Sequence, residues 1–160
     1  MPKREKKYCY DYPRPALTVD VALFHRTTDD VIEVLLIKRA FEPFKGMWSL
    51  PGGFVDQHEP LIKAAARELQ EETGVRRVRL EQFGAFGDPG RDPRGHTVSI
   101  GFTACLKKYP RVKAADDAEE ARWYSVTQLP RLAFDHKKLV RAALCHAFGQ
   151  GSERAGKSSV

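Results

Sequence analysis

The chain has 160 residues, which suits one globular domain with its own core and leaves no room for a second domain of ordinary size. Hydrophobic residues make up 42% and charged residues 30%, and no apolar run approaches the roughly 18 to 20 residues that span a bilayer, so a membrane-spanning protein is excluded. The net charge of +6 lies largely near the two ends, and we interpret it as solvated charge that helps to attract an anionic substrate, not as a nucleic-acid surface.

The N-terminal residues and the cysteines indicate the compartment. Residues 1–7 are polar and basic and no apolar segment follows them, so the pattern of a secretory signal is lacking. Cys9, Cys105 and Cys145 lie far apart and show neither the spacing of a zinc site nor that of a disulfide framework. We therefore expect reduced thiols and a cytoplasmic protein.

The first predicted elements are strands. Residues 16–24 and 31–38 are rich in β-branched and aliphatic side chains and are separated by a polar, turn-like segment, which predicts a strand pair. Residues 40–52 contain prolines and glycines that are incompatible with a helix, so we expect a loop that leads into a short strand around Trp48 to Leu50.

A helix is predicted over residues 60–73, because apolar side chains recur there at intervals of three and four residues. Pro60 suits the first helical position and Gly74 suits the C-terminal cap. The expected buried stripe consists of Ile62, Ala65, Ala66, Leu69 and Thr73.

The second half of the chain is predicted to hold two longer strands, 76–86 and 96–106, which are joined by a loop rich in turn residues and arginine, 87–95. Another short strand is expected from Trp123 to Val126. Residues 135–148 show helical spacing of apolar side chains and predict a terminal amphipathic helix.

Strands interleaved with two helices predict an α/β fold in which a mixed sheet is covered by helices on both faces. We expect one domain over residues 10–149. The flanking residues 1–9 are expected to be a flexible basic N-terminus, and residues 150–160 have nothing to bury and are expected to be a disordered tail.

Three glutamates on the predicted helix, Glu68, Glu71 and Glu72, are separated by three and four residues, which makes their carboxylates neighbours on one flank beside the apolar stripe. Like charges so placed repel by roughly 0.2 to 0.5 kcal/mol. A divalent cation offsets that repulsion, and Mg²⁺ typically binds one or two carboxylates, waters and substrate phosphates. The alternative is a solvated acidic face on which Arg67 pairs with Glu71.

The residues around this cluster favour the metal site. The pattern G-x5-E-x7-R-E-L-x-E-E-x-G-V runs from Gly53 to Val75, and a chance match of its seven fixed residues, at ~7% each, is on the order of one in a million. Glu59 stands directly before Pro60, where a helix prefers Ser, Thr, Asp or Asn as its N-cap. Its presence there indicates a functional demand.

The segment 53–75 is similar to the Nudix box and matches its fixed positions without a departure. The resemblance implies an α/β/α sandwich, and an enzyme that uses Mg²⁺ or Mn²⁺ to hydrolyse a nucleoside diphosphate linked to another group. It also implies that Arg67, together with Glu59, holds a catalytic glutamate in place. The implied metal ligands are Glu68 and Glu72, with Glu71 as a further ligand and the carbonyl of Gly52 as a backbone ligand.

Hydrolysis of a diphosphate needs a base as well as a cation. The cation neutralises phosphate oxygens and lowers the pKa of a bound water, and a carboxylate then accepts the water's proton. Family members differ in which glutamate does this, and some take it from a loop outside the box. The acidic residues of the loop before Trp123 are Asp116, Asp117, Glu119 and Glu120, of which we favour Glu120; the alternative is a solvated loop tip.

Three segments outside the box, 10–21, 86–102 and 129–136, resemble bacterial ADP-ribose pyrophosphatases of the Nudix family. The resemblance implies cleavage of ADP-ribose into AMP and ribose 5-phosphate. Planar guanidinium groups suit phosphate or ribose, and an aromatic ring suits adenine, although solvated arginines and core packing are the simpler alternatives. The candidate substrate-binding residues are Arg39, Trp48, Arg91 and Arg94.

Two other functions stay open. One is hydrolysis of a nucleoside triphosphate, such as an oxidised guanine nucleotide. The other is a non-catalytic Nudix domain that senses ADP-ribose in a transcription regulator, although such regulators need a winged-helix region and the intact glutamates favour an enzyme. Neither nucleic acid nor membrane is expected as a partner, and the family resemblance alone implies a homodimer.

Overall fold

The computed structural model describes residues 10–110, 112 and 118–149. The expectations for residues 1–9 and 150–160 lie outside these described residues. The elements are β1 (Ala16–Arg26), β2 (Ile32–Arg39), β3 (Trp48–Ser49), β4 (Gly52–Phe54), α1 (Leu61–Thr73), β5 (Glu81–Phe86), β6 (Thr97–Leu106), β7 (Ala118–Ser125) and α2 (His136–Phe148).

One mixed sheet contains all the strands, in the order β3-β2-β1-β6-β5, with β4 paired to β1 and β7 paired to β2. β1 runs parallel to β6, and the other pairings are antiparallel. β1 lies at the centre and is buried on both faces. Its side chains alternate between two core clusters, with Val19 and Val21 in one and Ala22 and Phe24 in the other.

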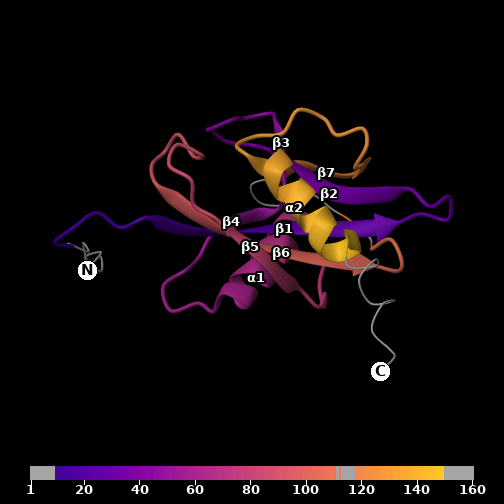
Figure 1. Ribbon diagram of the computed structural model, residues 1–160, viewed down its shortest axis with the longest axis horizontal. Coiled ribbons are helices and arrows are strands. Elements are labelled where there is room, and N and C mark those ends of the chain that lie inside the picture. Colours follow the sequence, from indigo (N-terminus) through magenta and orange to yellow (C-terminus); the bar gives the residue numbers. More distant parts are fainter. Residues whose placement is uncertain (1–9, 111, 113–117, 150–160) are drawn as a thin grey trace, which may run out of the picture.

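The two helices cover opposite faces of this sheet, as the sequence predicted. Ala64, Ala65 and Leu69 of α1 pack in the cluster that contains Val21. α2 packs in the cluster that contains Phe24, and Figure 1 shows it lying across the strands, with α1 on the other side. Among the described residues, no helix is both long enough and apolar enough to cross a membrane.

Two predicted strand boundaries were wrong. β5 begins at Glu81 and not at residue 76, because Arg77 has a φ of 59°, which is incompatible with an extended strand. β7 begins at Ala118, ahead of the predicted Trp123, because its first residues pair with the end of β2. Pairing with a partner strand, which is remote in sequence, extends β7 beyond its apolar part.

α1 ends as predicted but begins one residue later than predicted, and its buried face differs from the predicted stripe. Pro60 is the N-cap, and the N–H of Gly74, in the left-handed conformation with a φ of 72°, donates to the carbonyl of Gln70 at 2.8 Å. Ile62 is 49% exposed and Ala66 is exposed, so the predicted stripe is rotated from the real one. The buried residues of α1 are Ala64, Ala65, Leu69, Glu72 and Thr73.

Candidate active site

A cleft of about 650 Å³ lies between α1 and the strand ends beside it. β4 contributes Gly52 and Gly53, which lie next to β1 in the sheet. The wall opposite carries arginines from β2 and from the loop between β5 and β6. α1 contributes Arg67, Glu68, Glu71 and Glu72 to the cleft.

Arg67 lies at the centre of the carboxylates. Its Nη1 donates to Glu68 Oε1 at 2.7 Å and to Glu71 Oε2 at 3.0 Å. Its Nε and Nη2 donate to the two oxygens of Glu59 at 2.8 and 2.9 Å, and Nη2 also reaches the carbonyl of Phe54 at 3.0 Å. The predicted pair of Arg67 with Glu71 is present, but as one part of a wider network.

The sequence placed Glu59 at the N-cap of the helix, but the N-cap is Pro60, and Glu59 belongs to the network of Arg67 instead. Because Pro60 is the N-cap, Glu59 lies just outside the helix, where its side chain accepts both from Arg67 and from the Asp56 N–H. The hydrogen bond from Arg67, followed by that from the Asp56 backbone, lowers the pKa of Glu59 to about 2. Glu59 is therefore a fixed anion that orients Arg67.

Glu68 and Glu72 approach the backbone of β4 closely. Glu72 is buried, and its Oε2 accepts the Gly52 N–H at 2.8 Å. A Cβ atom on Gly53 would lie 2.5 Å from Glu68 Oε1, so only glycine leaves room for this carboxylate. This close approach explains why the predicted pattern begins with a glycine.

The carboxylates fit a divalent cation in their chemistry, although the described residues contain no group of three or more His, Cys, Asp and Glu side chains already arranged around one. One guanidinium nitrogen lies within hydrogen-bond distance of both Glu68 and Glu71, so a positive centre can reach both. Burial raises the pKa of Glu68, whereas the hydrogen bond and the charge of Arg67 act in the opposite direction. Carboxylate and backbone oxygens are the ligands that hard divalent cations prefer.

The arginines on the opposite wall are held against aromatic rings. Arg94 stacks over Phe54 at 5.0 Å and over Phe134 at 5.6 Å, and Arg39 lies 5.0 Å from the same Phe134 ring. The buried carboxylate of Asp92 accepts from both Nε and Nη2 of Arg94. Burial, followed by the charge of Arg94, lowers the pKa of Arg39. Two cations held this close favour an anion between them.

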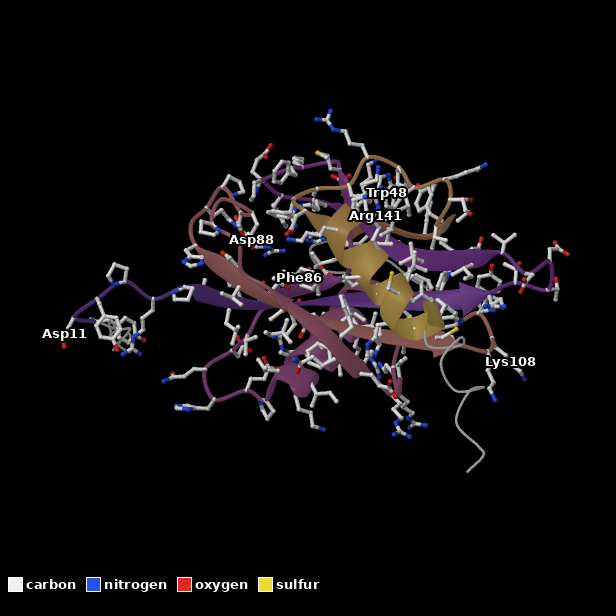
Figure 2. The ribbon with its side chains drawn as sticks, in the orientation of Figure 1. Asp11, Trp48, Phe86, Asp88, Lys108 and Arg141 are labelled. Atoms are coloured by element: carbon white, nitrogen blue, oxygen red, sulfur yellow. The ribbon has the colours of Figure 1, made fainter. Side chains whose placement is uncertain are left out.

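Two candidate substrate residues are engaged by other side chains. Trp48 packs edge-on against Tyr124 and belongs to the core cluster under α2, and Figure 2 shows it on the side of the sheet opposite α1. Arg91 is paired through two hydrogen bonds with Asp135, and its side chain is only 5% exposed. Trp48 therefore serves packing. Arg91 lines a smaller hollow beside the cleft, with its guanidinium engaged by Asp135.

The candidate base Glu120 lies on the face of the sheet that α2 covers, not on the face that α1 covers. In β7 it alternates with Ala121 and Trp123, which pack under α1, and shares its face with Tyr124, which packs under α2. Its carboxylate pairs with Lys38 at 3.2 Å, away from the glutamates of α1. Glu119 is exposed and lies at an irregularity in the pairing of β7 with β2, whereas Asp116 and Asp117 lie outside the described residues.

Several residues of this region were not predicted from the sequence. Asp92 and Phe134 hold Arg94, and Asp20 and His136 line a smaller hollow that adjoins the cleft. A signal was available only for Asp20, which is the one charged residue within the apolar segment 16–24.

Comparisons with known proteins give a consistent picture. Residues 14–143 match the NUDIX domain family. The chain is 41% identical over 139 residues to the ADP-ribose pyrophosphatase of Methanocaldococcus jannaschii, and the match covers 87% of this chain and 79% of that relative. It is 38% identical over 137 residues to the ADPR responsive transcriptional repressor NtrR of Acinetobacter baylyi, with 83% and 54% covered, so it spans about half of the repressor's length.

Among solved structures, the NUDIX domain of Shewanella oneidensis NrtR in complex with ADP ribose is similar with a TM-score of 0.75 and 36% identity. The similarity covers 84% of this chain and 91% of that chain. The mixed sheet with a helix on each face is thus the same fold.

Proposed function

This chain belongs to the NUDIX domain family, and on that premise we propose that it hydrolyses ADP-ribose to AMP and ribose 5-phosphate with the help of a bound divalent cation. The similarity to an ADP-ribose pyrophosphatase at 41% identity supports the substrate. The arrangement of the cleft carries the proposal, because carboxylates grouped around Arg67 face a wall with Arg39 and Arg94. One side suits a cation and the other suits the diphosphate.

We propose Mg²⁺ as the cation, with Mn²⁺ as the alternative. When bound, such an ion neutralises phosphate oxygens and lowers the pKa of a coordinated water. The chain supplies the oxygens and fixes their positions, since Gly53 makes room for Glu68 and Arg67 restrains two carboxylates. The proposed ligands are Glu68, Glu71, Glu72 and the carbonyl of Gly52.

Among the glutamates of the site, we propose Glu71 as the group that accepts the proton of the attacking water. Its side chain is 41% exposed, whereas those of Glu68 and Glu59 are 13% and 15% exposed, so Glu71 has room to meet a water in the cleft. A pKa of about 2 makes Glu59 a weak base and supports its role as the partner of Arg67.

Substrate recognition is proposed for Arg39 and Arg94. Asp92 engages Nε and Nη2 of Arg94 and leaves its Nη1 for a ligand. Pro43 accepts from Nε of Arg39 at 2.8 Å, which leaves the terminal nitrogens toward the cleft. Guanidinium groups fixed in this way bind a phosphate at a smaller loss of side-chain entropy.

A second candidate is binding of ADP-ribose without hydrolysis. The similarity to the repressor and to the NUDIX domain in complex with ADP ribose favours it. Binding without hydrolysis differs from the first proposal in that the protein releases ADP-ribose chemically unchanged.

The decisive experiment incubates the purified protein with ADP-ribose and Mg²⁺ and separates the products by ion-exchange chromatography. We expect AMP and ribose 5-phosphate, and we expect Glu68→Gln to lose nearly all activity. Tight binding of ADP-ribose without products would favour the sensor. A nucleoside monophosphate and pyrophosphate, formed from an oxidised guanine triphosphate in preference to ADP-ribose, would favour the triphosphatase. Equal rates for Glu68→Gln and the parent would refute the proposed cation site.

A further inference from the structure

A network of buried polar groups lies beside the cleft, outside the groups assigned to the proposed reaction. Asp20 of β1 and His136, the first residue of α2, are both buried. The Ser99 hydroxyl donates to Asp20 Oδ2, and His136 Nε2 lies 3.5 Å from Asp20 Oδ1. The Leu50 N–H completes the chain by donating to His136 Nδ1 at 2.9 Å. The side chains of β1 and β6, the backbone of Leu50 between β3 and β4, and the first residue of α2 thus form one connected network.

The two ring nitrogens of His136 have different partners. Nδ1 accepts from the Leu50 N–H and therefore carries no proton, so the proton of the neutral ring is on Nε2, which faces Asp20. Asp20 is in turn fixed by the Ser99 hydroxyl. The imidazole orients one backbone amide, and the carboxylate orients the imidazole.

That amide belongs to the segment that leads into β4. The Pro51 carbonyl accepts from the Val21 N–H at 2.8 Å, and the Gly52 N–H donates to Glu72 at 2.8 Å. The segment Leu50 to Gly52 is therefore fixed at three successive residues, and only the first contact comes from α2. A shift of Leu50 displaces Gly52 and the carboxylate bonded to it.

Asp20 also sets the position of Gly52 by direct packing. A Cβ atom on Gly52 would lie 2.8 Å from Asp20 Oδ1 and 2.1 Å from the Val19 carbonyl oxygen. Asp20 and Gly52 are partners in the pairing of β1 with β4. The same carboxylate therefore lies beside both the imidazole and Gly52.

We propose that Asp20 and His136 are positioning residues, which hold the Leu50 backbone and, through it, the Gly52 carbonyl and the Glu72 carboxylate. The inference rests on the proposed function, in which these two groups ligate the cation. Neither Asp20 nor His136 touches the cation or the substrate. Loss of a partner that orients metal ligands typically costs about 10- to 100-fold in metal affinity or activity.

Two substitutions of His136 separate its contacts. The side-chain oxygen of asparagine lies close to the place of Nδ1 and can accept from the Leu50 N–H, whereas the amide nitrogen of glutamine lies close to the place of Nε2 and can donate to Asp20. His136→Asn thus keeps the positioning bond, and His136→Gln removes it. His146→Gln, on the same helix, is the control.

A readout apart from activity is the binding of Mn²⁺ to the substrate-free protein. The electron paramagnetic resonance signal of the free ion measures this binding. We expect His136→Gln to bind Mn²⁺ about tenfold more weakly and to lower kcat more than it raises KM, with faster hydrogen exchange at the Leu50 amide. His136→Asn should restore most of the affinity and the slow exchange. Parental affinity in His136→Gln, or equal losses in both variants, would overturn the inference.

Ser99→Ala keeps the inference testable if His136→Gln does not fold. It frees the Asp20 carboxylate and leaves the Leu50 contact, so we expect a weakening of Mn²⁺ binding of about threefold. Unchanged affinity would refute the part assigned to Asp20. A parent protein that binds Mn²⁺ but leaves ADP-ribose intact would refute the proposed function alone, because the Mn²⁺ comparison among variants still decides the positioning role.

Discussion

At the scale of single residues, Arg67 determines the charge balance of the cleft. It makes five hydrogen bonds to three carboxylates and one carbonyl, and its side chain is only 27% exposed. A guanidinium can do this because its planar fork offers five donors, whereas an ammonium offers three donors from one atom. The geometry of the fork, and not only its charge, is what the site uses.

Arg67→Lys is therefore expected to lower kcat about 10- to 100-fold, because the lysine keeps the charge but cannot hold Glu59 and Glu71 together. Steady-state kinetics with ADP-ribose measure the effect, and circular dichroism reports whether the fold is kept. Arg76→Lys, an exposed substitution just after α1, is the control. Equal kcat in both variants would show that charge alone is enough.

Arg94 is expected to act on substrate binding and not on the chemical step. Arg94→Lys loses the two-point contact with Asp92 and the stacking on Phe54, so a phosphate contact worth roughly 1.5 kcal/mol is weakened. We expect KM for ADP-ribose to rise about tenfold with kcat nearly unchanged. The matched control is Arg79→Lys, which is exposed. A fall in kcat at constant KM would contradict this assignment.

The spacing of charged residues predicted the acidic cluster and Arg67, because helical neighbours three and four residues apart must meet. It could not predict Asp92 as the anchor of Arg94, since the burial of Asp92 within a loop depends on the backbone of that loop. It also misplaced Glu120, because the face of a strand residue follows from pairing with β2 and not from nearness to Trp123.

At the scale of elements, the contact between α1 and β4 determines which face of α1 is buried and where its glutamates lie. The periodicity of residues 60–73 predicted the helix correctly but not its rotation, since Ile62 is exposed and Glu72 is buried. The reason is the Gly52 N–H, which offers the buried carboxylate a hydrogen bond and so makes its burial favourable. Hydrophobic spacing alone cannot include a polar residue in a buried face.

Gly53→Ala tests this contact. The added Cβ would lie 2.5 Å from Glu68 Oε1, which is the far end of a flexible side chain, so the carboxylate moves and the backbone does not. We expect activity to fall at least about tenfold, with the free energy of unfolding changed by less than about 1 kcal/mol. Gly149→Ala, whose Cβ would meet nothing within 4 Å, serves as the control. Unaltered activity in Gly53→Ala would mean that Glu68 needs no such room.

At the scale of the whole molecule, residues far apart in the chain meet at His136. Asp20 reaches it from β1, Leu50 reaches it from the link between β3 and β4, and the imidazole comes from α2. The sequence predicted the helix and the strands but gave no indication of this contact, because long-range placement determines it. The consequence is that one titratable ring links the stability of the fold to the geometry of the cleft.

The stability of the protein should depend on pH through this ring. Burial lowers the pKa of His136 below its usual 6.5, and the charges of Arg91 and Arg39 act in the same direction, whereas Asp20 and Asp135 act in the opposite direction. Below about pH 6.5 the unfolded chain therefore binds a proton at this residue that the folded chain does not. The folded state loses stability as the pH falls from 6.5 toward the lower pKa of the folded protein.

His136→Asn removes that proton and keeps an acceptor for the Leu50 N–H, so urea denaturation of both proteins between pH 8 and 5 isolates the effect. Above about pH 7.5 the difference in unfolding free energy between parent and variant should be constant. Below about pH 6.5 the parent should lose up to ~1.4 kcal/mol per pH unit relative to the variant, because one extra proton binds to its unfolded chain. If the unfolding free energies of parent and variant differed by the same amount at every pH, His136 would have the same pKa in the folded and unfolded protein. That result would contradict the assignment of a neutral ring that accepts from the Leu50 N–H.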